Sequence, residues 1–122
     1  MDENIKYLGL TTPQYAVLSQ LELESGISNA ELARRSFITA QTMHGIVSNL
    51  EKRELIKRKK RSNHGIILCA ELTNLGLKIV QKAHTSIRKV EDVMTSTMSE
   101  DKIALLENLL FECFNNLNSL KN

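Results

Sequence analysis

The 122-residue sequence lacks the features that stabilise small secreted domains or span membranes. Its two cysteines, Cys69 and Cys113, are far apart and form no Cys-x-x-Cys motif, which argues against a disulfide framework and against a zinc knuckle. No apolar run approaches membrane-spanning length, and the amino end, MDENIKYLGL, lacks the basic-then-apolar order of a signal peptide. The sequence therefore predicts a cytoplasmic protein of one domain with no membrane partner.

Catalytic and metal-binding signatures are also missing. The three histidines, His44, His64 and His84, are scattered, no glycine-rich phosphate loop is present, and no paired carboxylates accompany a nucleophile. Two tyrosines, three phenylalanines and no tryptophan form no cluster that would mark a ligand pocket. We therefore predict that the protein is not an enzyme and uses neither a cofactor nor a metal ion.

Positive charge is concentrated in the middle of the chain. The formal net charge is only +2, yet the stretch from Arg34 to Arg61 contains nine lysines and arginines against two acids, Glu51 and Glu54. Residues 57–61 read KRKKR and lie between two segments with strong periodicity, so they belong to a folded element rather than to a polybasic tail. This uneven distribution is typical of a nucleic-acid-binding surface.

Polar caps and apolar spacing predict a helix-turn-helix. Thr11, followed by Gln three residues later, begins a helix over about residues 12–24, Ser28 begins a second helix that ends near Arg35, and Thr39 begins a third. The third helix has apolar residues at i, i+3, i+4 and i+7, namely Met43, Ile46, Val47 and Leu50. Such a helix pair matches a helix-turn-helix, although helical domains also contain similar pairs for packing alone.

Two β-compatible segments follow the helix pair. Residues 55–60 (LIKRKK) and 65–72 (GIILCAEL) are separated by a loop containing Asn63, which suits a tight turn. A two-stranded ribbon directly after a helix-turn-helix is a wing, and the basic residues would lie along its first strand. We therefore predict a mainly α-helical fold with a small β-hairpin: a winged helix-turn-helix over residues 11–73, preceded by a short arm over residues 1–10.

The spacing of apolar residues over 74–122 predicts a helical dimerisation region. Thr73 begins a long helix over residues 73–98 and Ser99 begins a last helix, both with apolar residues at intervals of three and four. The last helix is apolar over more than one face, which favours contact with a second subunit; the alternative is a helical hairpin within one chain. The residues expected at the dimer contact are Val80, Ile87, Val90, Met94, Ile103, Leu106, Leu110, Cys113 and Leu117.

The order of these elements and several local motifs resemble the MarR family of winged-helix transcriptional regulators. LTTPQYAVL is similar to the family's Leu-Thr-x-x-Gln opening, NAELARRSFITAQTMHGIVSNLEKRELIKR to its Glu-Leu-Ala through Leu-Glu stretch, and ELTNLG to the Leu-Thr-x-x-Gly that closes the wing. The resemblance covers about Leu10 to Leu120. It implies a homodimeric, sequence-specific DNA-binding regulator, with repression at a palindromic operator as the expected mode of action.

Three features depart from the family pattern. Only about ten residues precede Thr11, so the family's additional amino-terminal helix is expected to be missing or reduced. Glu54 replaces the glycine that commonly ends the recognition helix, where a positive φ would cost on the order of 1 kcal/mol. At the wing tip, His64, Gly65 and Ile66 replace motifs in which relatives carry an arginine. These departures motivate the alternative of a winged-helix protein–protein adaptor with little specific DNA binding.

Base reading is assigned to the outward face of the third helix. Gln41 can bond adenine, Thr42 can meet a thymine methyl group or a phosphate, and His44 can donate to guanine. The basic residues can neutralise DNA phosphates. We expect the main phosphate contacts at residues 59–61, and we expect Arg58 partly to brace the wing. The predicted DNA-binding residues are Thr39, Gln41, Thr42, His44, Ser48, Arg58, Lys59, Lys60 and Arg61.

An effector is the least defined partner. The family resemblance implies release of DNA on binding a small aromatic ligand or on oxidation, so a small-molecule effector is a candidate partner. A cysteine that senses oxidants needs a lowered pKa and access to solvent. Because Cys69 and Cys113 both have apolar neighbours, we expect both to be buried as small hydrophobic residues.

Overall fold

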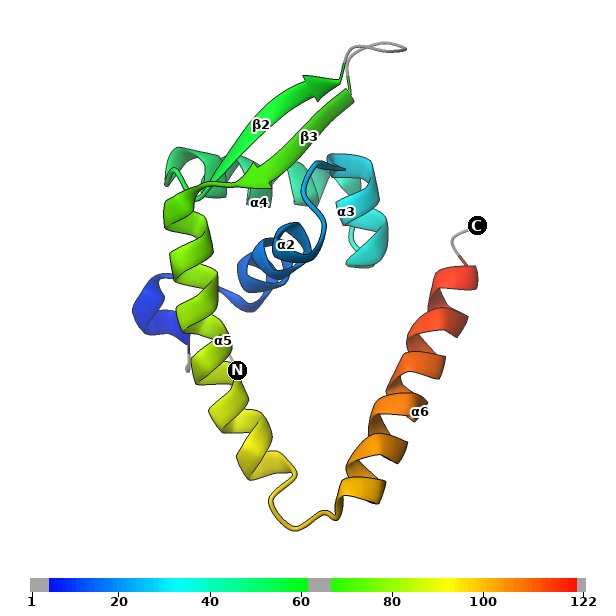
Figure 1. The fold of residues 1–122 in the computed structure, drawn as a ribbon. Coiled ribbons are helices and arrows are strands. Elements are labelled where there is room, and N and C mark those ends of the chain that lie inside the picture. The colour runs from blue at the N-terminus through cyan, green and yellow to red at the C-terminus, as the bar shows by residue number, and fades with distance from the viewer. Residues whose placement is uncertain (1–4, 62–66, 121–122) are drawn as a thin grey trace. The chain divides into compact units, whose positions relative to one another are not determined.

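The chain folds into helices and a small antiparallel sheet. The computed structural model describes residues 5–61 and 67–120, apart from the side chains of residues 60, 61, 67 and 68. It divides into two units, Met1–Ile87 and Arg88–Asn122. The elements are η1 (Lys6–Leu8), α2 (Thr12–Leu23), β1 (Ile27–Ser28), α3 (Asn29–Arg35), α4 (Ala40–Lys52), β2 (Ile56–Arg61), β3 (Ile67–Leu72), α5 (Asn74–Met94) and α6 (Glu100–Ser119) (Figure 1). The predicted fold class, a winged helix-turn-helix followed by two long helices, is confirmed.

Side-chain caps fix where the helices begin, as the sequence predicts. The Gln14 backbone amide donates to Thr11 Oγ1 and the Thr11 amide donates to Gln14 Oε1, which closes the capping box of α2. Ser28, Thr39 and Ser99 each accept a hydrogen bond from the amide three residues further on. These bonds satisfy amides that have no partner within the helix.

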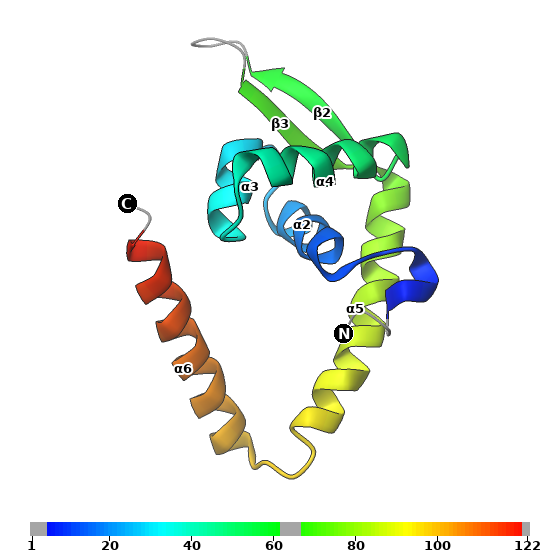
Figure 2. The same cartoon turned by 180° about the vertical axis from the view of Figure 1, so that it is seen from behind.

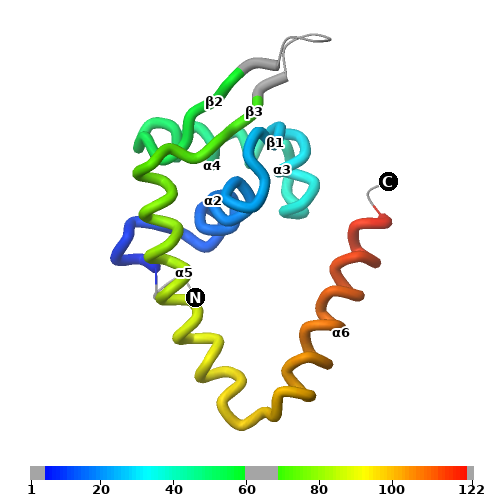
Figure 3. Tube along the Cα trace, in the orientation of Figure 1, coloured from blue at the N-terminus to red at the C-terminus, as the bar shows by residue number. Residues whose placement is uncertain are grey.

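A three-stranded antiparallel sheet in the order β1-β3-β2 forms the wing and its base (Figure 3). β2 pairs with β3 from Ile56 opposite Leu72 to Arg61 opposite Ile67, which confirms the predicted hairpin. The prediction of two strands missed a third, because β1 pairs with β3 on the side opposite β2. A strand of two residues is too short to show an alternating pattern, so the sequence carried no signal for it.

The first unit has a continuous apolar core. α4 contributes its predicted inward face, and in Figures 1 and 2 this helix lies between the wing and α2. The segment expected to be a short arm contains η1, and its Ile5 and Leu10 are buried in the same core. Residues 5–10 are therefore part of the packed fold.

Two helices end in a left-handed turn without glycine. The φ angle is +61° at Glu54 and +56° at Phe37. After α4, the Glu54 amide donates to the Glu51 carbonyl and the Leu55 amide donates to the Leu50 carbonyl, and the same two bonds recur after α3. This is the Schellman arrangement, in which the left-handed position favours glycine. Buried Leu50 and Leu55 fix the turn after α4 despite the backbone cost.

α5 begins at the base of the wing. Thr73 Oγ1 accepts from the Gly76 amide at 3.0 Å and donates to the Glu54 carbonyl oxygen at 2.6 Å. A Cβ atom at Gly76 would lie only 2.0 Å from the Leu55 carbonyl oxygen. Glycine is therefore required for this close approach of α5 to the chain after α4.

α5 ends at Met94, earlier than the predicted end at residue 98. The Thr95 and Ser96 hydroxyls donate to carbonyl oxygens of the preceding turn. Side chains that bond the local backbone in this way compete with continuation of the helix. The segment before Ser99 is therefore a connection between α5 and α6.

Candidate nucleic-acid interface

The amino-terminal half of α4 presents polar side chains to solvent. The exposed residues are Thr39, Gln41, Thr42 and His44. The Thr42 amide donates to Thr39 Oγ1 at 3.1 Å, and the Thr39 hydroxyl donates to Thr42 Oγ1 at 2.9 Å. A Cβ atom at Gly45 would meet nothing within 4 Å, so the surface is open there. The fold thus brings four of the predicted DNA-binding residues together on one surface.

The carboxyl-terminal half of α4 is tied into the fold instead. The Ser48 hydroxyl is a hydrogen-bond acceptor for Arg58, and Gln14 Nε2 donates to Asn49 Oδ1 at 2.9 Å. Arg53 donates to two backbone carbonyl oxygens of the amino-terminal segment at 2.7 and 3.3 Å. Ser48, a predicted DNA-binding residue, therefore differs from the other four in that it is half-buried and its side chain is bonded to Arg58 of the wing.

Alternation along β2 directs its cations to opposite sides. Lys57 Nζ and Lys59 Nζ lie 3.3 and 3.1 Å from Glu71 Oε1 on the neighbouring strand. The hydrogen bond from Lys59, with a smaller contribution from Lys57, holds the pKa of the Glu71 carboxyl below its ordinary value. Arg58 points the other way, toward α4. The wing thus carries two exposed lysines that share one carboxylate.

The rest of the predicted wing surface lies outside the described residues. This applies to the side chains of Lys60 and Arg61 and to the tip residues His64, Gly65 and Ile66. The main phosphate contacts are predicted at residues 59–61, and of these three the structure describes the side chain of Lys59.

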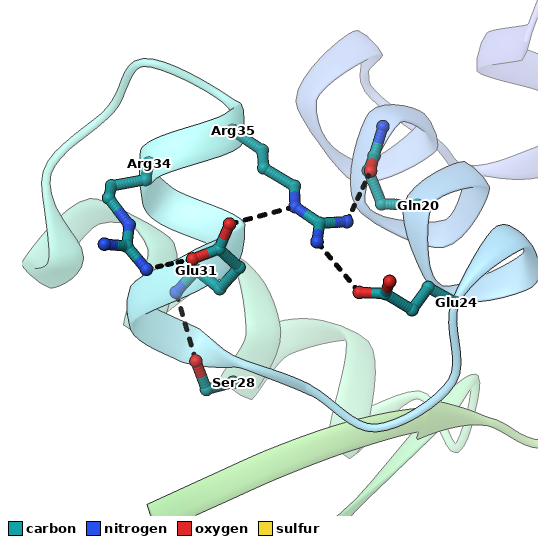
Figure 4. A network of polar contacts seen from close by, with 6 residues as sticks. All are labelled: Gln20, Glu24, Ser28, Glu31, Arg34 and Arg35. Atoms are coloured by element: carbon teal, nitrogen blue, oxygen red, sulfur yellow. Dashed lines mark hydrogen bonds and ion pairs between the residues drawn. The ribbon is translucent and has the colours of Figure 1, made fainter. Parts of the chain in front are cut away.

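The two arginines at the end of α3 are paired with acids of the same unit (Figure 4). Arg35 Nη2 lies 2.8 Å from Glu24 Oε2, its Nε lies 3.1 Å from Glu31 Oε1, and Arg34 pairs with the same Glu31. The hydrogen bond from Arg35 is the largest cause of a lowered pKa at Glu31. Arg35 therefore links α3 to α2, whereas Arg34 keeps 56% of its side chain exposed.

A chain of polar contacts also joins α2 to α5. The Tyr15 hydroxyl lies 2.6 Å from His84 Nδ1, and His84 Nε2 lies 2.7 Å from Glu22 Oε1. Sequence reasoning missed this contact because the three residues are distant in sequence. It also missed the role of Glu71, which the hairpin register would have placed opposite Lys57.

The predicted dimer residues fall into three groups by burial. Val80 and Ile87 are 0% and 3% exposed and belong to the core of the first unit. This corrects the prediction for these two residues, because packing within the chain already covers them. Val90, Ile103 and Leu106 are half-buried. The exposed members are Met94, Leu110, Cys113 and Leu117.

The second unit exposes a broad apolar surface. On α6 the exposed large residues are Leu105, Leu109, Leu110, Phe111, Phe114, Leu117 and Leu120. An open groove of about 370 Å³ lies between the end of α5 and the start of α6, lined by residues that include Met94, Ile103 and Leu106. The expected burial of both cysteines is confirmed for Cys69 and wrong for Cys113, which lies on exposed α6.

Within residues 5–61 and 67–120, no helix is long and apolar enough to cross a membrane. In the same ranges, no group of three or more histidine, cysteine or acidic side chains is arranged to hold a metal ion.

Comparison with known proteins connects this arrangement to one family. Residues 8–65 match the family model described as MarR family. An HTH-type transcriptional repressor of Mycobacterium tuberculosis is 33% identical over 84 residues, which is 69% of this chain and 60% of the relative. The chain therefore spans about three fifths of the length of the first curated relatives it matches.

Solved structures of MarR family proteins have a fold similar to that of this chain. A Mycobacterium tuberculosis MarR family protein in complex with DNA is similar with a TM-score of 0.76 and 25% identity, covering 92% of this chain and 83% of that one. A complex with salicylic acid from the same organism gives a TM-score of 0.72 and 26% identity, with the same coverage.

Proposed function

The chain belongs to the MarR family, and on this premise we propose that it binds double-stranded DNA as a homodimer and represses transcription from a palindromic operator. The observation that carries the proposal is the exposed polar half of α4 beside a wing with exposed lysines. The curated relative of Mycobacterium tuberculosis is named a transcriptional repressor, which supports repression as the mode.

The proposed contacts divide into reading and positioning. Gln41, Thr42 and His44 lie where a recognition helix meets base edges in the major groove. Lys59, with Lys60 and Arg61, would meet phosphates or the minor groove. Because Lys57 and Lys59 share Glu71, their net charge is smaller than a residue count suggests. Affinity should therefore fall with salt less steeply than nine cations per subunit would predict.

A homodimer is supported by the apolar surface of α6. Large exposed apolar surfaces on a monomer mark interaction sites, and a two-fold dimer would present two α4 helices to the two halves of a palindrome. The proposed contact residues are Val90, Met94, Ile103, Leu106, Leu110, Cys113 and Leu117. Light scattering at micromolar concentration tests this, and a monomer would contradict it.

We also propose a small-molecule effector and a cytoplasmic location, where a repressor meets its DNA. The effector is supported by the salicylic acid complex of a similar protein. Adding salicylic acid to the preformed DNA complex tests it, with loss of binding as the expected result. The alternative of a protein–protein adaptor is not favoured, and we propose no enzymatic activity, since the relatives are transcriptional regulators.

The decisive experiment is an anisotropy titration on DNA from upstream of the protein's own gene. Wild-type protein should bind this DNA more tightly than a scrambled duplex. Reversing the wing charges with Lys59→Glu, Lys60→Glu and Arg61→Glu should abolish binding without unfolding the protein. The matched control reverses three exposed lysines of α5, Lys78, Lys82 and Lys89, and should retain most of the binding. Equal binding to the scrambled duplex would reject the proposed sequence-specific function.

A further inference from the structure

Arg58 is unlike the other described cations of the wing. Its side chain is 14% exposed, whereas those of Lys57 and Lys59 are 59% and 64% exposed. Its Nε lies 3.2 Å and its Nη2 3.1 Å from Glu51 Oε1, and Nη2 donates to Ser48 Oγ at 2.9 Å. A cation placed in this way faces the protein rather than solvent.

Ser48 and Glu51 are suited to being bridged by one guanidinium. They stand three residues apart on α4, so their side chains are neighbours on one helix face. The planar fork of arginine can bond both acceptors at once, whereas the single ammonium of lysine has no fixed fork. The contact joins the first strand of the wing to the half of α4 that does not carry the exposed reading residues.

We infer that Arg58 is a positioning residue: it sets the orientation of the wing relative to α4 and does not itself contact DNA. The inference rests on the proposed function and refines its site. It removes Arg58 and Ser48 from the set of direct DNA contacts, because the Arg58 guanidinium faces α4 and donates to the Ser48 hydroxyl.

A fixed wing matters because α4 and the wing must engage one duplex together. A two-stranded hairpin is only marginally stable by itself, so its orientation depends on contacts at its base. Without the Arg58 contact, the wing would have to be ordered when DNA binds, which weakens affinity without removing a phosphate contact. Loss of the brace should therefore lower affinity at every salt concentration by the same factor.

The test is Arg58→Lys, which keeps the charge and loses the fork. Affinity for the preferred duplex should fall roughly tenfold, while the slope of log K against log salt stays unchanged. Lys59→Ala, the control for a phosphate contact, should make the slope shallower by roughly 1.8 for two subunits, at about 0.9 per contact. The pair Ser48→Ala and Glu51→Gln should reproduce the Arg58→Lys loss, and combining all three should add nothing.

Two outcomes of the DNA titrations would overturn the inference. One is wild-type affinity for Arg58→Lys; the other is a slope change for Arg58→Ala equal to that of Lys59→Ala, which would make Arg58 a phosphate contact. Hydrogen exchange provides a readout without DNA: Arg58→Lys should speed exchange of the β2 and β3 amides and leave α2 unchanged. If wild-type protein binds no DNA, the proposed function fails, and unchanged exchange would separately refute the brace.

Discussion

The substitution Glu71→Gln tests how the wing controls its own charge. Glu71 Oε1 lies 3.1 Å from Lys59 Nζ and 3.3 Å from Lys57 Nζ, so the carboxylate is already an ion-pair partner of the lysine that we propose contacts a DNA phosphate. On DNA binding, phosphate must compete with this internal partner. Removing the negative charge should therefore free cationic charge on each wing and strengthen DNA binding at low salt.

The expected size follows from counterion release. If Glu71→Gln frees the equivalent of one lysine per subunit, a dimer makes about two more phosphate contacts, and the salt slope steepens by roughly 1.8. Between about 50 and 200 mM salt, a fourfold change, this slope adds roughly a tenfold loss of affinity. The variant should thus bind more tightly than wild type at low salt, and the two should converge as salt rises.

The assay is an anisotropy titration of labelled operator DNA at several salt concentrations. Glu112→Gln on α6 is the control, because it removes the same charge from an exposed residue that does not belong to the wing. An unchanged or shallower slope for Glu71→Gln would refute the reasoning, since it would mean that these lysines neutralise no phosphate.

Three further predictions concern stability. Gly76→Ala should destabilise the protein by about 1–3 kcal/mol in urea unfolding, because its Cβ would lie 2.0 Å from the Leu55 carbonyl oxygen. Gly45→Ala is the control: a Cβ there meets nothing within 4 Å, so this variant should be more stable by roughly 0.5–1 kcal/mol. Similar effects of the two substitutions would contradict the packing argument. Glu54→Gly should stabilise by up to about 1 kcal/mol because φ is +61° there; calorimetry should show no gain for Glu54→Ala, which keeps the backbone cost. The pKa of Glu31 is lowered from 4.5, so its ion pairs stabilise the fold above that pH, and this stabilisation is lost as pH falls through the lowered pKa of the folded state. Acid unfolding of Glu31→Gln should lack this pH-dependent loss of stability. An acid-unfolding profile identical to that of wild type would contradict the stabilising role of the ion pairs.

The sequence predicted local structure well because local rules decide it. Caps at Thr11, Ser28, Thr39 and Ser99 depend on a hydroxyl and the next three amides, all adjacent in the chain. Glu54, by contrast, was singled out through the resemblance to the MarR family, and its φ is positive just before buried Leu55.

Tertiary partners were harder to predict because spacing indicates that a face is buried without indicating what covers it. Val80 and Ile87 have the same three-and-four spacing as residues of a dimer seam, yet they pack in the core of their own unit. Cys113 illustrates the reverse, since apolar neighbours on α6 are themselves exposed.

Charge counts were incomplete for a related reason. The sequence shows the cations of the middle segment, but their acids come from other elements: Glu24 from the end of α2 for Arg35, and Glu71 from β3 for Lys59. The density of basic residues therefore predicted a strand with exposed lysines and overstated its net charge.

The most direct test of the central claim is the affinity ratio between the upstream duplex and a scrambled duplex, measured for wild type and for Gln41→Ala at one moderate salt concentration. The exposed half of α4 predicts a clear wild-type preference for the upstream duplex. In Gln41→Ala this preference should shrink by about 1–3 kcal/mol per lost bidentate base contact while binding to scrambled DNA stays unchanged. Equal binding of wild type to both duplexes, or a ratio that Gln41→Ala leaves intact, would contradict base reading by this helix face.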